Sequence, residues 1–120
     1  MLGAHMKKSN KRKSLKNKRS WLRLAHEAKY SSANMAALCG ITARQLERHA
    51  QQVLGCTPQQ WLDEQRMVRA QSLLRELDTI KEVAFKLGYV QASHFSRHFK
   101  EHAGMTPSQY IKLHQRMELL

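Results

Sequence analysis

An internal repeat constrains the fold of this chain more than any other feature of its sequence. Ala36 and Gly40 are matched in the second half by Ala84 and Gly88. The second turn has one extra residue, and after it the match continues. The first copy has Leu46, Arg48, His49, Gly55, Thr57, Pro58 and Trp61. The second copy has, in the same order, Phe95, Arg97, His98, Gly104, Thr106, Pro107 and Tyr110. Because glycine, Thr-Pro and aromatic positions recur in the same order, we infer that one supersecondary unit is used twice.

The length and composition predict an all-α fold. A chain of 120 residues has room for one compact domain, or for two very small ones that share a helix, but not for a catalytic domain beside a recognition domain. Glycine (5) and proline (2) are scarce, and no run of alternating β-branched residues suggests a sheet. The sequence shows no stretch of membrane-spanning length and no signal peptide, so we expect a cytoplasmic protein.

Helical spacing and capping signals predict a helix-turn-helix in the first copy of the repeat. The first helix is expected to begin at an N-cap, Ser20, and its apolar positions are Trp21, Leu24, Ala25 and Ala28. A second helix is expected over 32–39, ending at Gly40, where a left-handed C-cap suits glycine. The segment from Thr42 to Gln45 has the capping-box form T-x-x-Q and opens a third helix. This order of helix, glycine turn and capped helix is that of a helix-turn-helix.

The same order returns in the second copy, after a long helix. That helix is expected over 58–77, and its apolar positions are Trp61, Leu62, Val68, Ala70, Leu73, Leu74 and Leu77. Asp78 or Thr79 then caps a fifth helix that ends at Gly88, and a sixth helix is expected over about 91–104. The organisation that follows is a cloning scar and a disordered basic tail (1–19), a first helix-turn-helix subdomain (20–57), a linker helix (58–77) and a second helix-turn-helix subdomain (78–120).

The charge of this chain is concentrated near its N-terminus. The formal net charge is +12, and residues 7–19 hold eight of the 21 Lys and Arg residues and none of the nine acidic ones, namely Lys7, Lys8, Lys11, Arg12, Lys13, Lys16, Lys18 and Arg19. Such a tail can bind any polyanion or remain solvated. A preference for particular base sequences must therefore come from the folded part.

The sequence resembles the DNA-binding domain of the AraC-type family of bacterial transcription regulators over about residues 20–113. The residues that carry the resemblance are Arg66, Ala70, Leu73, Leu74, Ile80, Val83, Ala84, Gly88, Tyr89, Ser93, Phe95, Ser96, Arg97, Phe99, Lys100, Gly104, Met105, Thr106, Pro107 and Tyr110. The resemblance implies seven helices, the fourth of which joins two homeodomain-like helix-turn-helix subdomains, with the third and sixth helices in successive major grooves of DNA. It also implies RNA polymerase as a partner.

Two departures from the family pattern are informative. Ser32 and Ala50 replace larger apolar residues, so the core of the first subdomain is expected to be smaller. Val90 and Gln91 replace the Ser or Asp that usually caps the second recognition helix. The sensing domain common in the family is absent from this sequence, which leaves open a free-standing small regulator or a fragment of a longer one.

The outward residues of the two recognition helices are the expected base-reading set. If Leu46, Ala50, Phe95 and Phe99 point inward, the outward positions are Ala43, Arg44, Glu47 and Arg48 in the third helix, and Ala92, Ser93, His94, Ser96 and Arg97 in the sixth. Arginine can bind guanine with two hydrogen bonds, glutamate can accept one from cytosine, and Ala92 can contact a thymine methyl group. The alternatives are that Arg48 and Arg97 are ordinary surface arginines or are paired with a neighbouring acid, and that Glu47 only orients a neighbouring arginine.

Phosphate contacts are expected from cations and helix starts near these helices. The candidates are Thr57, Lys86, Lys100 and Thr106, for each of which a merely solvated role is an equal alternative. The histidines at 94, 98 and 102 have a spacing that could bind a divalent metal, but no Cys or carboxylate completes a site, so neither a metal nor a cofactor is expected. Cys39 and Cys56 are interpreted as core residues, as are Trp21, Trp61 and Tyr110.

These observations predict sequence-specific binding of double-stranded DNA and regulation of transcription, with one chain bound as a monomer to one asymmetric site. The alternative is a general nucleic-acid-binding module, architectural or RNA-associated, in which the basic tail supplies most of the affinity. The sequence contains no paired carboxylates, nucleophile with base, or phosphate-binding loop, so an enzyme is not expected.

Overall fold

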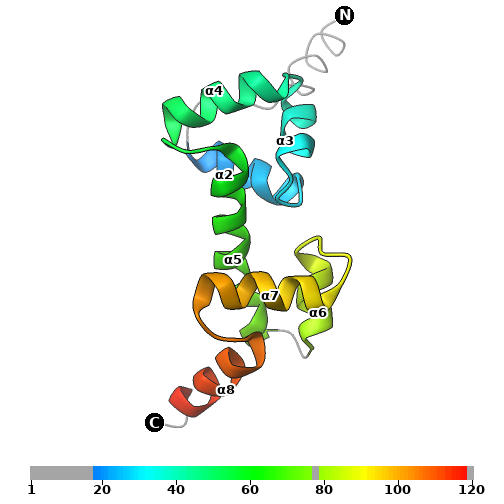
Figure 1. The fold of residues 1–120 in the computed structure, drawn as a ribbon, viewed down its shortest axis with the longest axis vertical. Coiled ribbons are helices and arrows are strands. Elements are labelled where there is room, and N and C mark those ends of the chain that lie inside the picture. The colour runs from blue at the N-terminus through cyan, green and yellow to red at the C-terminus, as the bar shows by residue number, and fades with distance from the viewer. Residues whose placement is uncertain (1–17, 77–78, 119–120) are drawn as a thin grey trace, which may run out of the picture. The chain divides into compact units, whose positions relative to one another are not determined.

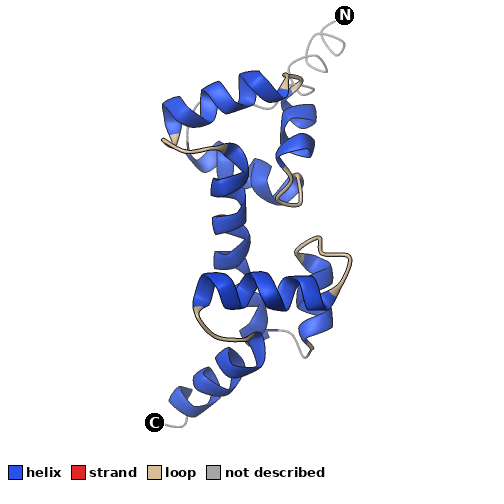
Figure 2. Cartoon of the chain, in the orientation of Figure 1, coloured by secondary structure: helices blue, strands red, loops and turns tan. Residues whose placement is uncertain are grey.

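The computed structural model describes residues 18–76 and 79–118, and every regular element in these ranges is an α-helix (Figures 1 and 2). The helices are α2 (Lys18–Glu27), α3 (Ser32–Cys39), α4 (Ala43–Val53), α5 (Pro58–Glu76), α6 (Ile80–Lys86), α7 (Ala92–Ala103) and α8 (Pro107–Glu118). For these ranges, the predicted all-α fold with seven helices is confirmed. Within the described ranges, no helix has the length and apolar character needed to cross a membrane.

The chain divides into two compact units, Met1–Gln65 and Arg66–Leu120, and the boundary falls inside α5. Each half of α5 therefore belongs to a different unit, whereas the sequence reasoning set the whole linker helix apart as a segment. The segment boundaries after residues 57 and 77 stay predictions. At about 1.5 Å per residue, α5 is about 28 Å long.

The core of the first unit is built from α2, α3, α4 and the first turns of α5. The Trp21 side chain is fully buried and meets Trp61 edge-on, with 5.8 Å between the ring centroids. Trp61 itself is half-buried, so its interpretation as a core residue holds only in part. Helix α2 already includes Lys18 and Arg19, so Ser20 lies inside the helix and is not its N-cap as expected.

The turn between α2 and α3 is held by a residue of α5. Lys29 and Tyr30 both have positive φ angles, 52° and 60°, which costs free energy for side chains with a Cβ atom. The Gln59 side chain bridges this turn: its Oε1 accepts a hydrogen bond from the Ser32 backbone N–H at 3.0 Å, and its Nε2 donates to the Tyr30 carbonyl at 3.0 Å. A single amide thus connects the end of the turn to the start of α3.

The turn of the first helix-turn-helix has the predicted chemistry. Gly40 lies in the left-handed region with φ 67° and closes α3, as expected from the sequence. Thr42 accepts a hydrogen bond from the Gln45 backbone N–H, and the Gln45 side chain accepts one from the Thr42 N–H, which confirms the capping box. The reciprocal hydrogen bonds between Thr42 and Gln45 therefore define the start of α4, which is the third helix expected from the sequence.

The second unit repeats this arrangement, with Phe95 and Phe99 at the positions of Leu46 and Ala50. Helix α6 packs on α7, and α7 packs on α8. The buried residues of α6 and α7 include Val83, Ala84, Phe95 and Phe99. Thr79 caps α6 by accepting a hydrogen bond from the Glu82 N–H; the other candidate cap, Asp78, lies outside the described residues, as does the expected apolar residue Leu77.

One of the apolar residues of α5 is exposed. Val68 retains 55% of its accessible surface, whereas Met67, Ala70 and Leu74 are buried. These three residues are spaced i, i+3 and i+7 and therefore share one face of the helix, and Val68 is turned away from that face by the helical rotation of one residue. Apolar character alone therefore does not decide which residues of α5 are buried.

Candidate nucleic-acid interface

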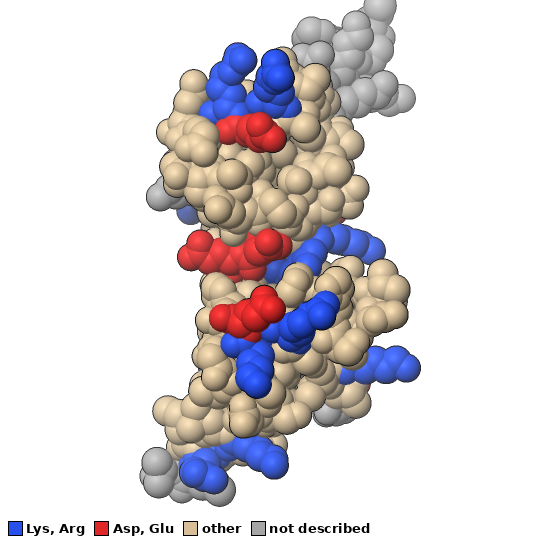
Figure 3. All heavy atoms as spheres, viewed as in Figure 1, with Lys and Arg blue, Asp and Glu red and all other residues tan. Residues whose placement is uncertain are grey.

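Helix α4 presents the first group of expected base-reading residues. Leu46 and Ala50 are buried and hold one face of the helix against the first unit. Ala43, Arg44, Glu47 and Arg48 are all exposed: the two arginines lie opposite the buried face, and Ala43 and Glu47 lie beside it. Figure 3 shows basic side chains gathered over α4, with an acidic side chain beside them. The structure therefore brings together on one surface the residues that the sequence grouped.

Helix α7 presents the second group of expected base-reading residues and is packed into the second unit by two buried aromatic side chains. Phe95 and Phe99 are fully buried, with ring centroids 5.8 Å apart. A hollow of about 290 Å³ lies at the start of the helix and is lined by Gln91, Ser93, His94 and Arg97. Ser93, His94 and Arg97 are exposed, as expected.

The remaining two residues of the second group are less outward than expected. Ala92 and Ser96 are half-buried. Their positions explain this, because residues 92, 95, 96 and 99 are spaced three and four apart and share one face of the helix. The inward pull of Phe95 and Phe99 therefore partly covers both small side chains. Within the α7 set, Ser93, His94 and Arg97 are thus the residues best placed for contact with a ligand.

The two arginines that the repeat relates occupy the same kind of position in both units. Arg48 lies two residues after buried Leu46, and Arg97 lies two residues after buried Phe95; both arginines are exposed. A long cationic side chain is thus presented at the same point of each second helix. Guanidinium groups bind phosphate and guanine with paired hydrogen bonds, which suits this face to duplex DNA.

A cluster of aromatic rings behind the α7 hollow was missed by the sequence reasoning. The Tyr89 hydroxyl and His98 Nδ1 form a hydrogen bond of 3.1 Å, and the His94 and His98 ring centroids lie 5.0 Å apart. The Arg66 guanidinium lies over the Tyr89 ring, 4.4 Å from its centroid. The four-residue spacing of the histidines was the one signal of this cluster in the sequence, because Tyr89 and Arg66 join them through tertiary packing.

The four expected phosphate-binding residues differ in exposure. Thr57, Lys86 and Lys100 are exposed, whereas Thr106 is half-buried. Both threonines are engaged as helix caps: the Thr57 hydroxyl oxygen accepts from the Gln60 N–H at 3.2 Å, and that of Thr106 accepts from the Gln109 N–H at 3.1 Å. Because the hydroxyl oxygens act as acceptors in these caps, each hydroxyl can still donate its own hydrogen.

Metal-binding and cysteine chemistry have little support in the described part of the chain. There, no group of three or more His, Cys, Asp and Glu side chains is placed to hold a metal ion. Cys39 is buried, and burial raises the pKa of its thiol. Cys56 is half-buried, as is Tyr110, so both are packed less completely than core residues.

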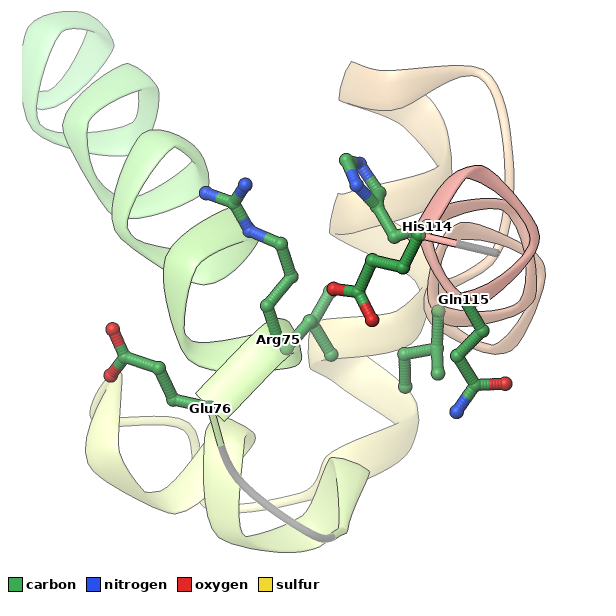
Figure 4. A pocket seen from close by; sticks show the side chains of 7 residues that line it. Arg75, Glu76, His114 and Gln115 are labelled. Atoms are coloured by element: carbon green, nitrogen blue, oxygen red, sulfur yellow. The ribbon is translucent and has the colours of Figure 1, made fainter. Parts of the chain in front are cut away.

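Another groove of the second unit lies between the end of α5 and α8. It has a volume of about 280 Å³ and is lined by Leu74, Arg75, Glu76, Ile111, His114, Gln115 and Glu118. Figure 4 shows Arg75 and His114 extending toward the space between the two helices, while the Glu76 carboxylate turns away from it. None of the expected base-reading or phosphate-binding residues lines this groove.

Two helix-turn-helix units in one chain, each with exposed polar residues on its second helix, define a DNA-binding domain as the class of protein. Comparison with known families agrees: a helix-turn-helix domain family matches residues 35–113. The chain belongs to this family, and within it to the AraC type.

Curated relatives are bacterial regulators. Over 74 residues the chain is 36% identical to the HTH-type transcriptional regulator GbdR of Pseudomonas aeruginosa. The matched segment covers 61% of this chain and 20% of that protein. The chain is also 37% identical over 68 residues to the HTH-type transcriptional activator RhaS of Escherichia fergusonii, and this match covers 56% of this chain and 24% of the relative. The chain thus spans only about a fifth to a quarter of the length of these curated relatives.

Solved structures of this fold include a complex with DNA. The DNA-binding domain of AdpA, a global transcriptional factor solved with a target DNA, has a TM-score of 0.71 and 26% identity, over 82% of this chain and 93% of that one. An AraC-type regulator from Chromobacterium violaceum has a TM-score of 0.64 and 28% identity, over 77% and 86% of the two chains.

Proposed function

We propose that this chain binds double-stranded DNA sequence-specifically and thereby regulates transcription, with α4 and α7 as the helices that read bases in successive major grooves. The proposal is supported by the family to which the chain belongs and by a similar domain that was solved with its target DNA. The base-reading residues are Ala43, Arg44, Glu47 and Arg48 on α4, and Ala92, Ser93, His94, Ser96 and Arg97 on α7.

The observation that carries this proposal is the pair of exposed arginines, Arg48 and Arg97, at equivalent points of the repeat. A duplicated fold could keep its core without keeping an exposed cation, because solvent-facing positions contribute little to stability. A guanidinium at the same place on both second helices is explained by the same ligand chemistry acting twice. Duplex DNA offers that chemistry, since guanine O6 and N7 recur in its major groove.

One chain should occupy one asymmetric site as a monomer. A single helix-turn-helix commonly needs a dimer to cover two half-sites, whereas this chain already carries two such units. The phosphate contacts are assigned to Thr57, Lys86, Lys100 and Thr106. As in the family that the chain belongs to, RNA polymerase is the expected protein partner, and the bacterial cytoplasm, at the nucleoid, is the expected location.

The test is a binding-site selection on random duplex DNA with the whole chain, followed by titration of the enriched duplexes at several salt concentrations. The expected result is an enriched site with two short blocks separated by about one helical turn, bound by one chain in sedimentation experiments. A site that requires two chains would contradict the monomer. A selection that enriches no sequence would contradict specific binding.

A general nucleic-acid-binding module is the second candidate, and the basic segment 7–19 is the observation that favours it. Such a module would bind random duplexes as tightly as selected ones, and its affinity would fall with salt by a purely electrostatic response. The same titrations therefore distinguish the two functions. Equal affinity for enriched and random duplexes would support the general module.

A further inference from the structure

We infer that Tyr89 and His98 are positioning residues that hold the His94 imidazole in the α7 hollow, and that His94 is thereby a specificity-determining residue for one base of the DNA site. This inference deepens the proposed function and rests on it. Among the expected base-reading residues, His94 is the one aromatic side chain, and its ring contacts those of Tyr89 and His98.

The contacts form a continuous chain from the inside of the second unit to its surface. Tyr89 is buried, and its ring is packed against Phe95 with 5.4 Å between centroids, while the Arg66 guanidinium lies over it at 4.4 Å. The Tyr89 hydroxyl and His98 Nδ1 are joined by a hydrogen bond of 3.1 Å. His98 is half-buried, and His94, one turn earlier on α7, is exposed.

Tyr89 contacts His94 as well as His98. Its ring meets that of His94 edge-on, with 6.2 Å between centroids, and that of His98 edge-on at 5.7 Å. The His94 and His98 rings are tilted at 41° to each other, 5.0 Å apart. Two anchored rings therefore limit the rotamers available to His94. A hydrogen bond to Nδ1 also fixes the ring orientation of His98, because the two ring nitrogens are not equivalent.

A preordered side chain binds more tightly and more selectively than a free one. An exposed imidazole that is ordered only on binding loses rotamer entropy at that moment, at a cost of about 0.5–1.5 kcal/mol per side chain. In this chain the contacts with Tyr89 and His98 order the His94 ring before DNA is bound, so this entropy is lost in the free protein and not on binding. His94 lines the hollow together with Gln91, Ser93 and Arg97, so an ordered ring presents a nitrogen at a defined place beside the arginine.

The experiment is a double-mutant cycle on the enriched duplex from the selection described above. Tyr89→Phe removes the hydroxyl but keeps the ring, and we expect it to weaken binding of the enriched duplex by roughly two- to tenfold, the fold-change equivalent of ordering one side chain. His94→Ala should weaken binding by at least as much. The double variant Tyr89→Phe/His94→Ala should lose no more than His94→Ala alone, because Tyr89 acts through His94.

The base preference gives a readout that a merely structural role of Tyr89 would not change. Titration against single-base variants of the duplex should show that Tyr89→Phe and His94→Ala relax the preference at the same base position. Tyr110→Phe is the matched control: Tyr110 belongs to the same unit but contacts Phe99 and His114 instead of the histidines of α7. It should leave affinity and base preference unchanged.

Several outcomes would overturn the inference. Additive losses in the cycle would show that Tyr89 acts independently of His94, and an unchanged base preference in Tyr89→Phe would show that its hydroxyl positions nothing on the DNA face. A loss of binding that merely follows a fall in Tm would assign Tyr89 to stability. If the wild-type chain enriches no duplex at all, the proposed function fails and the inference fails with it. If the wild-type chain enriches a duplex and Tyr89→Phe binds it with unchanged affinity and base preference, the inference alone is overturned.

Discussion

The start of α7 should be open to stabilisation by a single substitution. Gln91 occupies the N-cap with an extended backbone, φ −126° and ψ 135°, but its side chain makes no capping hydrogen bond. At the start of α4, by contrast, Thr42 has a similar extended backbone and accepts a hydrogen bond from the Gln45 N–H at 3.1 Å. The long Gln side chain does not supply the acceptor that a short side chain places over the first turn.

Replacing Gln91 by Ser should supply that acceptor. The backbone is already extended and Gln91 is exposed, so the change needs no rearrangement and removes no packing. A serine hydroxyl would accept from the N–H of Ser93 or His94. Caps of this kind are worth about 1 kcal/mol, and for a chain of this size we expect Tm to rise by about 4 °C.

Thermal and denaturant unfolding of the free protein measure this effect. The matched control is Gln52→Ser, the same change at an exposed position inside α4, where serine lowers helix propensity slightly and should leave Tm unchanged or a little lower. Gln91→Ser that melts no higher than the wild-type chain would refute the reasoning. DNA is left out of the assay because Gln91 also lines the hollow on α7.

Three further predictions concern binding and packing. Arg48→Ala and Arg97→Ala should each cost about 1–3 kcal/mol on the enriched duplex, with relaxed preference at different bases and little change in Tm; unchanged preferences in titrations against single-base variants would contradict the readout. Because burial raises the pKa of its thiol, Cys39 should react with a disulfide reagent at pH 7 far more slowly than half-buried Cys56, and equal rates would refute that packing. Removing residues 1–17, which keeps α2 whole, should weaken cognate and random duplexes by similar factors and flatten the salt dependence, whereas a loss on the cognate duplex alone would show sequence reading by that segment.

Much of the fold could be predicted from the sequence, because it depends on bonds between residues close in the chain. The Thr42 capping box joins residues three apart, and the left-handed turn at Gly40 depends on that residue's own backbone. Periodicity placed Leu46 and Phe95 in the core for the same reason, since a helix fixes which residues share a face. Exposure of the arginines at 48 and 97 follows from those two buried positions.

Packing between segments decided the rest. Gln59 holds a turn 29 residues earlier through Tyr30, and no local pattern marks a glutamine for that role. Tyr89 reaches His98 only because the turn after α6 folds against α7, so the positioning of His94 was hidden in the sequence. The exposure of Val68 was likewise decided by which face of α5 meets its neighbours. The sequence by itself determines the caps, the turns and the face of a helix on which each residue lies, because these depend on residues within a turn of one another. Contacts between distant segments depend on how the helices pack.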